Sequence, residues 1–551
     1  MRGRALAVGW RLSAMQTRIL ALLCLGLAST HALRSLAQPP GRMGAAARPA
    51  SFAASRRRGL RPPLSRSARV RMAIDVDDRG AVGVDDRGEG DRGLFDEEFA
   101  PCAERGGASS AAICALAAVG GGSTAVLVAE FKRAVLLCST LLTDQLPDDR
   151  FLWALPLLGG CAVAFLRLGT PPATTFDSSL GRNVEAAMAG EPVDLGIASV
   201  RTVASVFTLG TGCSLGPEGP AVELGAVVAR LSVAIAGLSG LGNITSAQRR
   251  TLVCSGAAAG VAAGFNAPLA AIAFAYEVAS ALRPFSPATS VDRGRGKYPA
   301  ILPVTLASAT AALVARAILA NGLSFDPSIL GEGSASVAEL PIYMLLGCFC
   351  GGGAVVFRYA TANSRAFFRD TLSPIVSPAL QPIVGGGACA LLSLIVPEVQ
   401  FSSYETLDGL VSSWSLLSSP ADPLVLYAAK SMATAVCLGS GLVGGLFAPS
   451  LFLGAALGAV FSQTFDGLSS VLGLGHATPS ELILTGAASL LSAVFSSPFT
   501  GALLIFDKTH SLQLLLPSLL SAAIASALAD ELAPVDTPRP AQSMETVDGE
   551  S

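Results

Sequence analysis

Long apolar runs follow one another from about residue 108 to residue 529, and they predict a chain that crosses a membrane many times. Only 14% of the residues are charged, whereas an ordinary soluble domain carries about 25%. Gly, Pro and Ser interrupt most runs, so few of them reach twenty clean apolar residues and tilted, short or broken helices are expected. The 58 glycines favour helices that pack closely through small residues. We predict an all-α polytopic membrane protein.

An internal repeat organises the chain. The sequence "LGTG" at residues 209–212 recurs as "LGSG" at residues 438–441, an offset of 229. Eight residues after the last Gly of each copy stands a proline, Pro220 or Pro449. Proline is well placed just inside a helix start, because its missing N–H would have no partner there. Each half therefore contains a Gly-rich loop that ends in a helix start.

A second element repeats with an offset of 230. The stretch "GFNAPLAAIAFAYEV" (264–278) matches "VFSSPFTGALLIFDK" (494–508), with Glu277 aligned to Asp507. Helices that start inside a membrane at matching places of two repeats are typical of transporter binding sites. These residues alone do not say whether the two halves are inverted or parallel.

The two repeated helix starts are candidate anion sites. A helix N-terminus presents main-chain N–H groups without intrahelical partners and about half a positive charge. No Lys or Arg occurs from 210 to 228 or from 438 to 461, so we expect the attraction to come from the main chain at Gly219, Leu446 and Phe447. Partial charges let an anion leave as well as enter.

Glu218 stands directly before the first of these helix starts. A carboxylate there can occupy the place of the anion when it is ionised and vacate it when it is protonated or displaced. An equally weighted alternative is that Glu218 caps the helix from the aqueous rim, as acidic residues commonly do.

Four stretches in this order resemble the CLC family of chloride channels and anion/proton exchangers. "GPEGPAVELGA" (216–226) resembles the G-(K/R)-E-G-P signature, and "GLFAPSLFLGAALG" (445–458) resembles the G-x-F-x-P signature. The segments around Pro268 and Pro498 are similar to the flanking helices, so the resemblance covers most of residues 107–530. It implies two inverted-topology repeats of tilted and broken helices, a homodimer, and one anion pathway per subunit. It also makes Glu218 the gating glutamate, with the N–H groups of Leu446 and Phe447 on the central anion.

One departure from the family bears on the transport mode. Family exchangers carry a second glutamate directly after the acid that Glu277 matches, on their proton route, and this chain has Val278 there. A valine cannot relay a proton. The resemblance therefore favours an anion channel, with chloride as the expected anion, over the alternative of an anion/proton exchanger. The chain ends at Ser551 without the nucleotide-binding pair of many eukaryotic members, so no regulation through such a pair is expected.

Other departures affect selectivity and the inner gate. The family's G-S-G-I-P stretch has its nearest counterpart in "FDSSLGRN" (176–183), where Ser178 or Ser179 is the candidate anion ligand, so chloride and nitrate both stay open. Pro217 replaces the basic residue of the first signature. No Tyr follows Tyr427, so the tyrosine that the family's last helix brings to the pore has no counterpart there.

Two other classes of function remain as alternatives. "GCSLG" (212–216) fits the G-x-S-x-G pattern of hydrolases, and an intramembrane serine hydrolase would need Ser214 to pair with His476 or His510. An inverted-repeat carrier of organic anions would need a cation near its substrate, for which Lys430, expected at the start of the helix before the second loop, is the candidate. We expect neither a cofactor nor a metal.

The N-terminal region differs in charge from the rest of the chain. Fourteen Arg and no Asp or Glu precede Asp75, which leaves 24 basic against 40 acidic residues after it, a formal charge of −16. The apolar run at 19–29 is typical of a secretory signal peptide, and the Arg- and Ser-rich stretch after it is typical of a transit peptide. We therefore expect a plastid membrane, thylakoid or envelope, with a secretory-pathway membrane as the alternative. The predicted organisation is a signal peptide (1–37), a transit-like segment (38–74), an acidic disordered linker (75–106), membrane repeat 1 (107–340), membrane repeat 2 (341–531) and a disordered tail (532–551).

Overall fold

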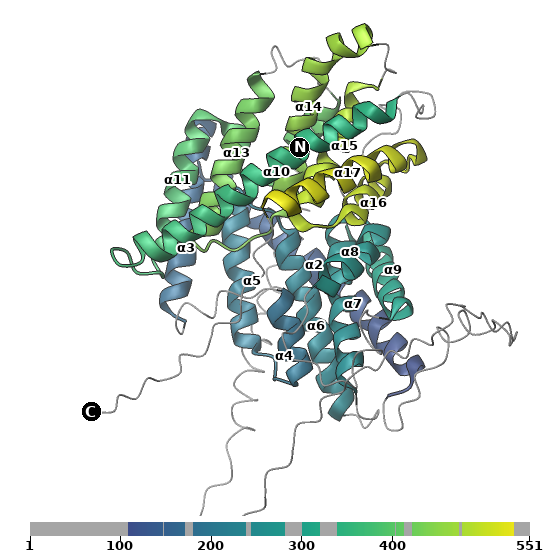
Figure 1. Cartoon of the computed structure of the whole chain (residues 1–551). Helices are drawn as coiled ribbons and strands as arrows, with labels where there is room; N and C mark the ends of the chain where they lie inside the picture. Colours follow the sequence, from purple (N-terminus) through teal and green to yellow (C-terminus); the bar gives the residue numbers. More distant parts are fainter. Residues whose placement is uncertain are drawn as a thin grey trace, which may run out of the picture. The chain divides into compact units, whose positions relative to one another are not determined.

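The computed structural model describes the membrane region of the chain, within one compact unit (Figure 1). The predicted signal peptide, transit segment and acidic linker lie outside the described residues, as does nearly all of the predicted tail. The described residues are 108–146, 148–170, 180–238, 244–281, 300–319, 339–402, 404–412, 421–472 and 477–533.

Helices make up both halves of this unit, and they follow the same order in each. The first half contains α2 (Ser110–Thr143), α3 (Leu155–Leu168), α4 (Leu180–Ala189), α5 (Leu195–Gly210), α6 (Glu218–Leu238), α7 (Ser246–Phe265), α8 (Pro268–Ala281) and α9 (Ile301–Ile318). The second contains α10 (Leu340–Ala366), α11 (Gln381–Ile395), α12 (Tyr404–Ser412), α13 (Ala421–Gly439), α14 (Phe447–Leu472), α15 (Pro479–Phe495), α16 (Pro498–Thr509) and α17 (Leu512–Leu532). Short 3-10 turns precede α3 and follow α11, and a π-helical turn (Phe367–Leu372) extends α10.

Backbone conformation repeats along with the sequence. Gly212 and Gly441, 229 residues apart, both have left-handed φ angles, of 82° and 84°. Asn266 and Ser496, 230 residues apart, end α7 and α15 with φ angles of 56° and 52°. Only glycine adopts the left-handed region without steric cost, which explains the glycine in both copies of the first element.

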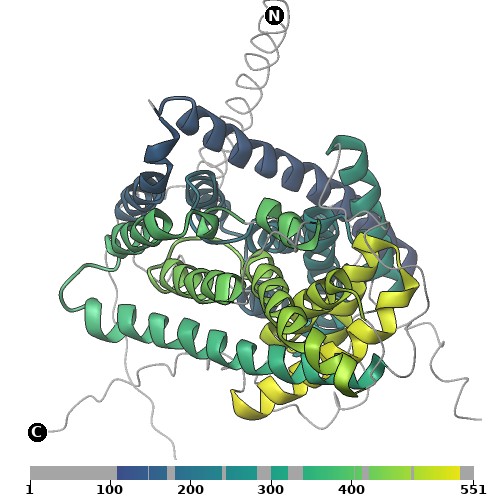
Figure 2. The ribbon, with the colours of Figure 1, turned by 90° about the horizontal axis from the view of Figure 1, so that it is seen from above.

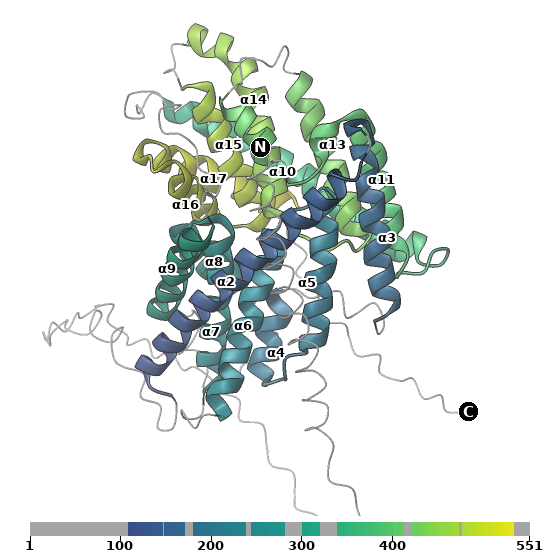
Figure 3. The same cartoon turned by 180° about the vertical axis from the view of Figure 1, so that it is seen from behind.

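The two repeats are inverted with respect to each other, and equivalent elements contact one another. The long helices α2 and α10 lie on opposite sides of the bundle when it is seen from above (Figure 2). Between them α3 packs on α11 and α8 packs on α16, as both side views show (Figures 1 and 3). These pairings are reciprocal: Gly160 fits against the carbonyl of Pro382, and Gly386 fits against that of Pro156.

Small residues allow neighbouring helices to approach closely, as the glycine content predicts. A methyl group on Gly225 or Gly256 would overlap the main chain of the other helix where α6 crosses α7. The equivalent crossing of α14 and α15 has Gly454 and Gly486 in the same relationship. Close main-chain approach is how membrane helices gain packing energy without a hydrophobic drive between them.

The helices vary in their capacity to span a membrane. In the described parts of the chain, seven helical segments are long and apolar enough to cross: Ser110–Thr143, Phe151–Leu168, Glu218–Gly237, Ile301–Ile318, Leu340–Leu372, Phe447–Phe465 and Leu512–Leu532. Four further apolar helices have only 10–17 residues. This mixture of full and short helices agrees with the expectation of broken spans.

Candidate anion site

The two Gly-rich loops meet at the centre of the site. The first loop joins α5 to α6, which begins at Glu218, and the second joins α13 to α14, which begins at Phe447. Gly216 and Gly445 exchange main-chain hydrogen bonds, N–H to O, over 2.9 Å and 2.7 Å. This antiparallel bridge joins residues 229 apart, so equivalent points of the two repeats pair with each other. The structure therefore brings the two helix starts that the sequence marks to one place.

Glu218 lies inside this crossing and is only 1% exposed. Its Oε1 accepts a hydrogen bond from the hydroxyl of Tyr404, the first residue of α12. Its Oε2 lies over Gly216, close to the main-chain amide of Ala448 in the first turn of α14. Among the described residues Oε2 has no hydrogen bond of good geometry. The interpretation of a cap at the aqueous rim is wrong, because the carboxylate is buried.

The start of α14 is fixed by aromatic packing. The ring of Phe447 stacks on Phe495 with 4.2 Å between centroids, and it contacts Phe265 and Phe274 at 5.7 Å and 5.6 Å. Phe265 and Phe495 end α7 and α15 and are repeat equivalents. Leu446 precedes the first residue of α14, so its N–H, with those of Phe447 and Ala448, belongs to the groups that a helix start leaves without intrahelical partners.

Gly219 lies on the other side of the crossing. A methyl group on Gly219 would come within 2.7 Å of Gly445 Cα, so the first turn of α6 fits directly against the second loop. The structure therefore brings Glu218, Gly219, Leu446 and Phe447 together, as the sequence predicts. Ser178 and Ser179 lie outside the described residues.

Tyr404 is a contact that sequence reasoning missed. It lies 186 residues from Glu218, on a helix that no motif marks. The segment before it is tied to the first loop, because the N–H of Phe401 donates to Gly212 O over 3.1 Å. The sequence signal that could have drawn attention to Tyr404 is the rarity of tyrosine, because the chain holds only 6 tyrosines. The tyrosine that reaches Glu218 therefore comes from α12.

Lys430 does not lie at a helix start, contrary to the expectation from sequence. It sits in the middle of α13, is fully buried, and donates to the carbonyls of Val399 and Phe401 over 2.9 Å each. It also lies 5.8 Å from the centroid of the Phe452 ring. Its ammonium therefore anchors the segment that leads to Tyr404, which is a positioning role.

The two loops carry no Lys or Arg, as the sequence shows, but two lysines from distant helices approach the site. Lys132 of α2 donates to Gly264 O, and Lys508 of α16 donates to Phe265 O. Both ammonium groups interact electrostatically with Glu218. The search along the two loops could not find them, because neither lysine belongs to a loop.

The remaining candidate residues are Ser214, the two histidines and Val278. Ser214 is buried, and its hydroxyl lies 3.1 Å from that of Thr434 on α13. His510 ends α16 as an exposed residue, and His476 lies outside the described residues. Val278 is half-buried against the main apolar core.

Glu277 and Asp507 form a reciprocal pair of helix caps. Glu277 accepts hydrogen bonds from the N–H groups of Phe499 and Thr500 at the start of α16, over 2.8 Å and 2.7 Å. Asp507 accepts from Leu269 and Ala270 at the start of α8, over 2.9 Å and 3.0 Å. Each repeat therefore caps the equivalent helix of the other.

Comparison with known proteins supports one family. The family model described as voltage gated chloride channel matches residues 179–530, well over half of the chain. The chain is 36% identical over 329 residues to chloride channel protein CLC-f of Arabidopsis thaliana, covering 58% of this chain and 39% of that protein. It is 32% identical over 434 residues to chloride channel protein CLC-e of the same plant, covering 73% and 58%. The chain thus spans only about half the length of these plant relatives.

Bacterial relatives and solved structures support the same family and fold. The H(+)/Cl(-) exchange transporter ClcA of Citrobacter koseri is 30% identical over 335 residues, with 60% of this chain and 65% of that protein covered. The crystal structure of a slow cyanobacterial Cl−/H+ antiporter has the same fold, with a TM-score of 0.61 at 23% identity over 77% of this chain and 95% of that one. A CLC-type fluoride/proton antiporter superposes with a TM-score of 0.56 at 21% identity, with the same coverage. By its family match, its broken inverted repeats and its paired helix starts, this chain belongs to the voltage gated chloride channel (CLC) family and is a multi-pass integral membrane protein.

Proposed function

We propose that this chain conducts small anions, chloride first among them, through the crossing of α6 and α14, and that Glu218 is the gate. The observation that carries the proposal is the position of the Glu218 carboxylate, buried beside the amide of Ala448 in the first turn of α14. A helix start is a site where main-chain N–H groups favour a negative charge. The carboxylate therefore stands where a permeating anion would be held.

The gating step follows from competition for one place. An ionised Glu218 excludes the anion, and a protonated or displaced Glu218 leaves the amides of Leu446, Phe447 and Ala448 to it. The Tyr404 hydroxyl stabilises the closed position, because a hydrogen bond to a charged group is worth about 1.5–3 kcal/mol. Opening thus requires either a proton or an anion that competes with the carboxylate.

Passive conduction is the transport mode that we propose. Val278 stands at the position of the family's proton-route glutamate and packs against the apolar core. The relatives carry both kinds of name, a chloride channel protein and an H(+)/Cl(-) exchange transporter. Exchange is therefore the second candidate, and a proton-driven anion flux would favour it.

We also propose a homodimer and a plastid location. A homodimer with one pathway per subunit follows from the family resemblance, and cross-linking of the purified protein tests it. A plastid membrane follows from the basic, acid-free character of residues 1–74. Both are independent of the gate.

The experiment that tests the gate uses the full chain in liposomes loaded with chloride. In the unmodified protein, we expect chloride efflux to rise as the pH falls, because protonation releases Glu218. Glu218→Gln should give efflux that is high and independent of pH, since its side chain cannot ionise. The matched control is Glu531→Gln on the exposed end of α17, which should keep the pH response. A pH response that survives Glu218→Gln would overturn the gate assignment.

A further inference from the structure

The C-terminal end of α7 receives lysine ammonium groups from both repeats. Lys132 of α2 donates to Gly264 O, and Lys508 of α16 donates to the next carbonyl, that of Phe265. The last carbonyls of a helix lack intrahelical partners and carry partial negative charge, so a cation there is favourable. The equivalent helix end in the second repeat shows how a single cation caps such carbonyls.

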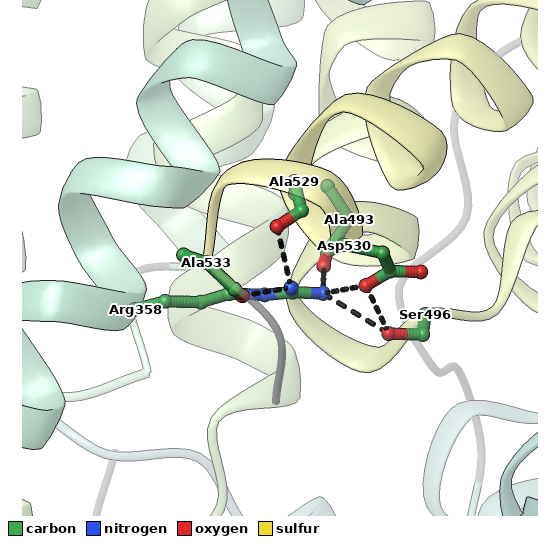
Figure 4. Close-up of polar contacts among 6 residues, drawn as sticks. All are labelled: Arg358, Ala493, Ser496, Ala529, Asp530 and Ala533. Carbon is green, nitrogen blue, oxygen red and sulfur yellow. Dashed lines mark hydrogen bonds and ion pairs between the residues drawn. The ribbon is translucent and has the colours of Figure 1, made fainter. Parts of the chain in front are cut away.

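Arg358 of α10 is the counterpart of Lys132 in the second repeat. It follows Lys132 by 226 residues, the offset that also relates Gly160 to Gly386 in these helix pairs. Its guanidinium forms an ion pair of 2.8 Å with Asp530 and donates to main-chain carbonyls (Figure 4). Those carbonyls belong to Ala493, Ala529 and Ala533, and Ser496 accepts a further bond. A carboxylate of α17 thus neutralises the capping cation in the second repeat.

The cations at the end of α7 face the gate. A methyl group on Gly264 would lie 3.9 Å from Glu218 Cγ, so the carbonyl that Lys132 caps adjoins the glutamate. Lys508 is 4% exposed and Glu218 is 1% exposed, and both lysines interact electrostatically with the carboxylate. Interactions between charges strengthen where water is excluded.

A small apolar cavity lies beside Lys508, between α7, α12, α14, α15 and α16. It measures about 10 Å³, close to the smallest volume that can hold one water molecule. Lys508 and Phe265 line it together with Leu407 of α12 and Leu451 of α14. Only apolar surface lines the cavity, so Lys508 meets it with the hydrocarbon part of its side chain.

The other charged groups around α6 are directed elsewhere. Arg201 of α5 pairs with Glu223 of α6 over 2.7 Å, and Arg133 of α2 pairs with Glu130 over 2.6 Å. Arg230 of α6 donates to Asn183 of α4, and Asp507 of α16 caps α8. The arginines of α7, Arg249 and Arg250, lie in its first turns, about 20 Å along the helix from Gly264. Arg316 of α9 is a further cation at the end of α7, where it donates to the side chain of Asn266 over 2.9 Å. Tyr404 of α12 donates its hydroxyl to Glu218, as described above.

We propose that Lys132 and Lys508 form an electrostatic clamp that holds Glu218 ionised against the start of α14 and so sets the pH at which the gate opens. The two lysines are positioning residues, because they act through Glu218. The clamp joins the repeats in function, since α2 belongs to the first and α16 to the second. It rests on the proposed gating role of Glu218.

The test compares charge-removing and charge-keeping variants of the full chain in chloride-loaded liposomes. Lys132→Gln and Lys508→Gln keep a donor for the α7 carbonyls and remove the charge. A nearby opposite charge shifts a carboxyl titration by about one unit or more. Each variant should therefore raise the pH of half-maximal efflux by about one unit, because a carboxylate without its cation takes up a proton more readily. Lys132→Arg and Lys508→Arg should keep the midpoint of the unmodified protein.

Two sets of controls distinguish an effect of the lysine charges on Glu218 from the loss of a helix cap and from the loss of the gate. Asp530→Asn and Arg358→Gln perturb the equivalent cap of α15 and should lower thermal stability without moving the midpoint. In a Glu218→Gln background, neither lysine variant should alter the pH profile. The clamp is wrong if Lys132→Gln and Lys508→Gln leave the midpoint unchanged while Glu218→Gln still abolishes the pH response. If Glu218→Gln itself leaves that response intact, the proposed function fails and the clamp fails with it.

Discussion

Gly216 and Gly445 exchange a reciprocal pair of main-chain hydrogen bonds, of 2.9 Å and 2.7 Å, at the point where the two repeats cross. Each residue is the repeat equivalent of the other, so the bridge joins the two halves at equivalent points. The first turn of α6 and the first turn of α14 meet there, with the Glu218 carboxylate between them. Inversion of the repeats is the reason that two helix starts can point at one place.

Gly445→Ala should disrupt this crossing. A methyl group on Gly445 would overlap the main chain of Gly219, where neither backbone can withdraw without breaking the bridge. Overpacking of this kind costs roughly 1–3 kcal/mol in the free energy of unfolding. We expect a lower thermal unfolding midpoint in detergent and reduced chloride flux. Gly352→Ala on α10, where a methyl group meets nothing within 4 Å, is the control and should leave both unchanged.

Tyr404→Phe should loosen the gate. The substitution removes the hydroxyl that donates to Glu218 and keeps the ring, so the closed position loses about 1.5–3 kcal/mol. Chloride efflux at neutral pH should then rise about tenfold or more, measured against the unmodified protein. Tyr427→Phe is the control, because its hydroxyl donates to Gly353 O over 2.7 Å, away from Glu218. Equal efflux in Tyr404→Phe and the unmodified protein would show that Tyr404 does not hold the gate.

Glu277→Ala and Asp507→Ala should destabilise the pairing of α8 with α16. Each carboxylate accepts from two first-turn N–H groups of the opposite helix, and loss of such a cap costs about 1 kcal/mol. We expect both variants to unfold at lower temperature in detergent, and the double variant lower still. Asp408→Ala, an exposed residue of α12, supplies the reference. Stability equal to the reference would contradict the capping role.

The reversal potential should follow the chloride gradient alone. With Val278 in the place of the family's proton-route glutamate, we expect no proton movement to be tied to the anion. In planar bilayers, a change of about one pH unit on one side should leave the reversal potential unmoved at fixed chloride. A shift toward a constant anion-to-proton ratio would instead establish exchange as the function.

The N-terminal region should direct a passenger to plastids. A fluorescent protein that carries residues 1–74 should accumulate there in a cell whose plastids lie inside the secretory system, because the segment joins a signal-like run to an acid-free basic stretch. Residues 1–37 alone should stop in the secretory pathway. Retention of both fusions in secretory membranes would favour the alternative location.

Much of the backbone could be predicted from local patterns. Pro220 and Pro449 mark helices that begin at Glu218 and Phe447, and the aligned Phe265 and Phe495 end equivalent helices. These features depend on neighbours in the chain, because proline, glycine and capping groups act within a few residues.

The surroundings of Glu218 could not be predicted in the same way. Tyr404 lies 186 residues from it along the chain, and the lysines that approach it come from α2 and α16. Lys430 illustrates the same limit, since its sequence position suggested a helix start and the fold buries it in the middle of α13.

The sequence by itself determined a membrane chain of two repeats, with helix starts at matching places and an acidic residue at one of them. Those properties follow from transfer free energies and local backbone geometry, which each segment carries alone. Only the tertiary structure decided which charges and hydroxyls face that acid, because the inverted packing of one repeat on the other brings together side chains that no local pattern relates.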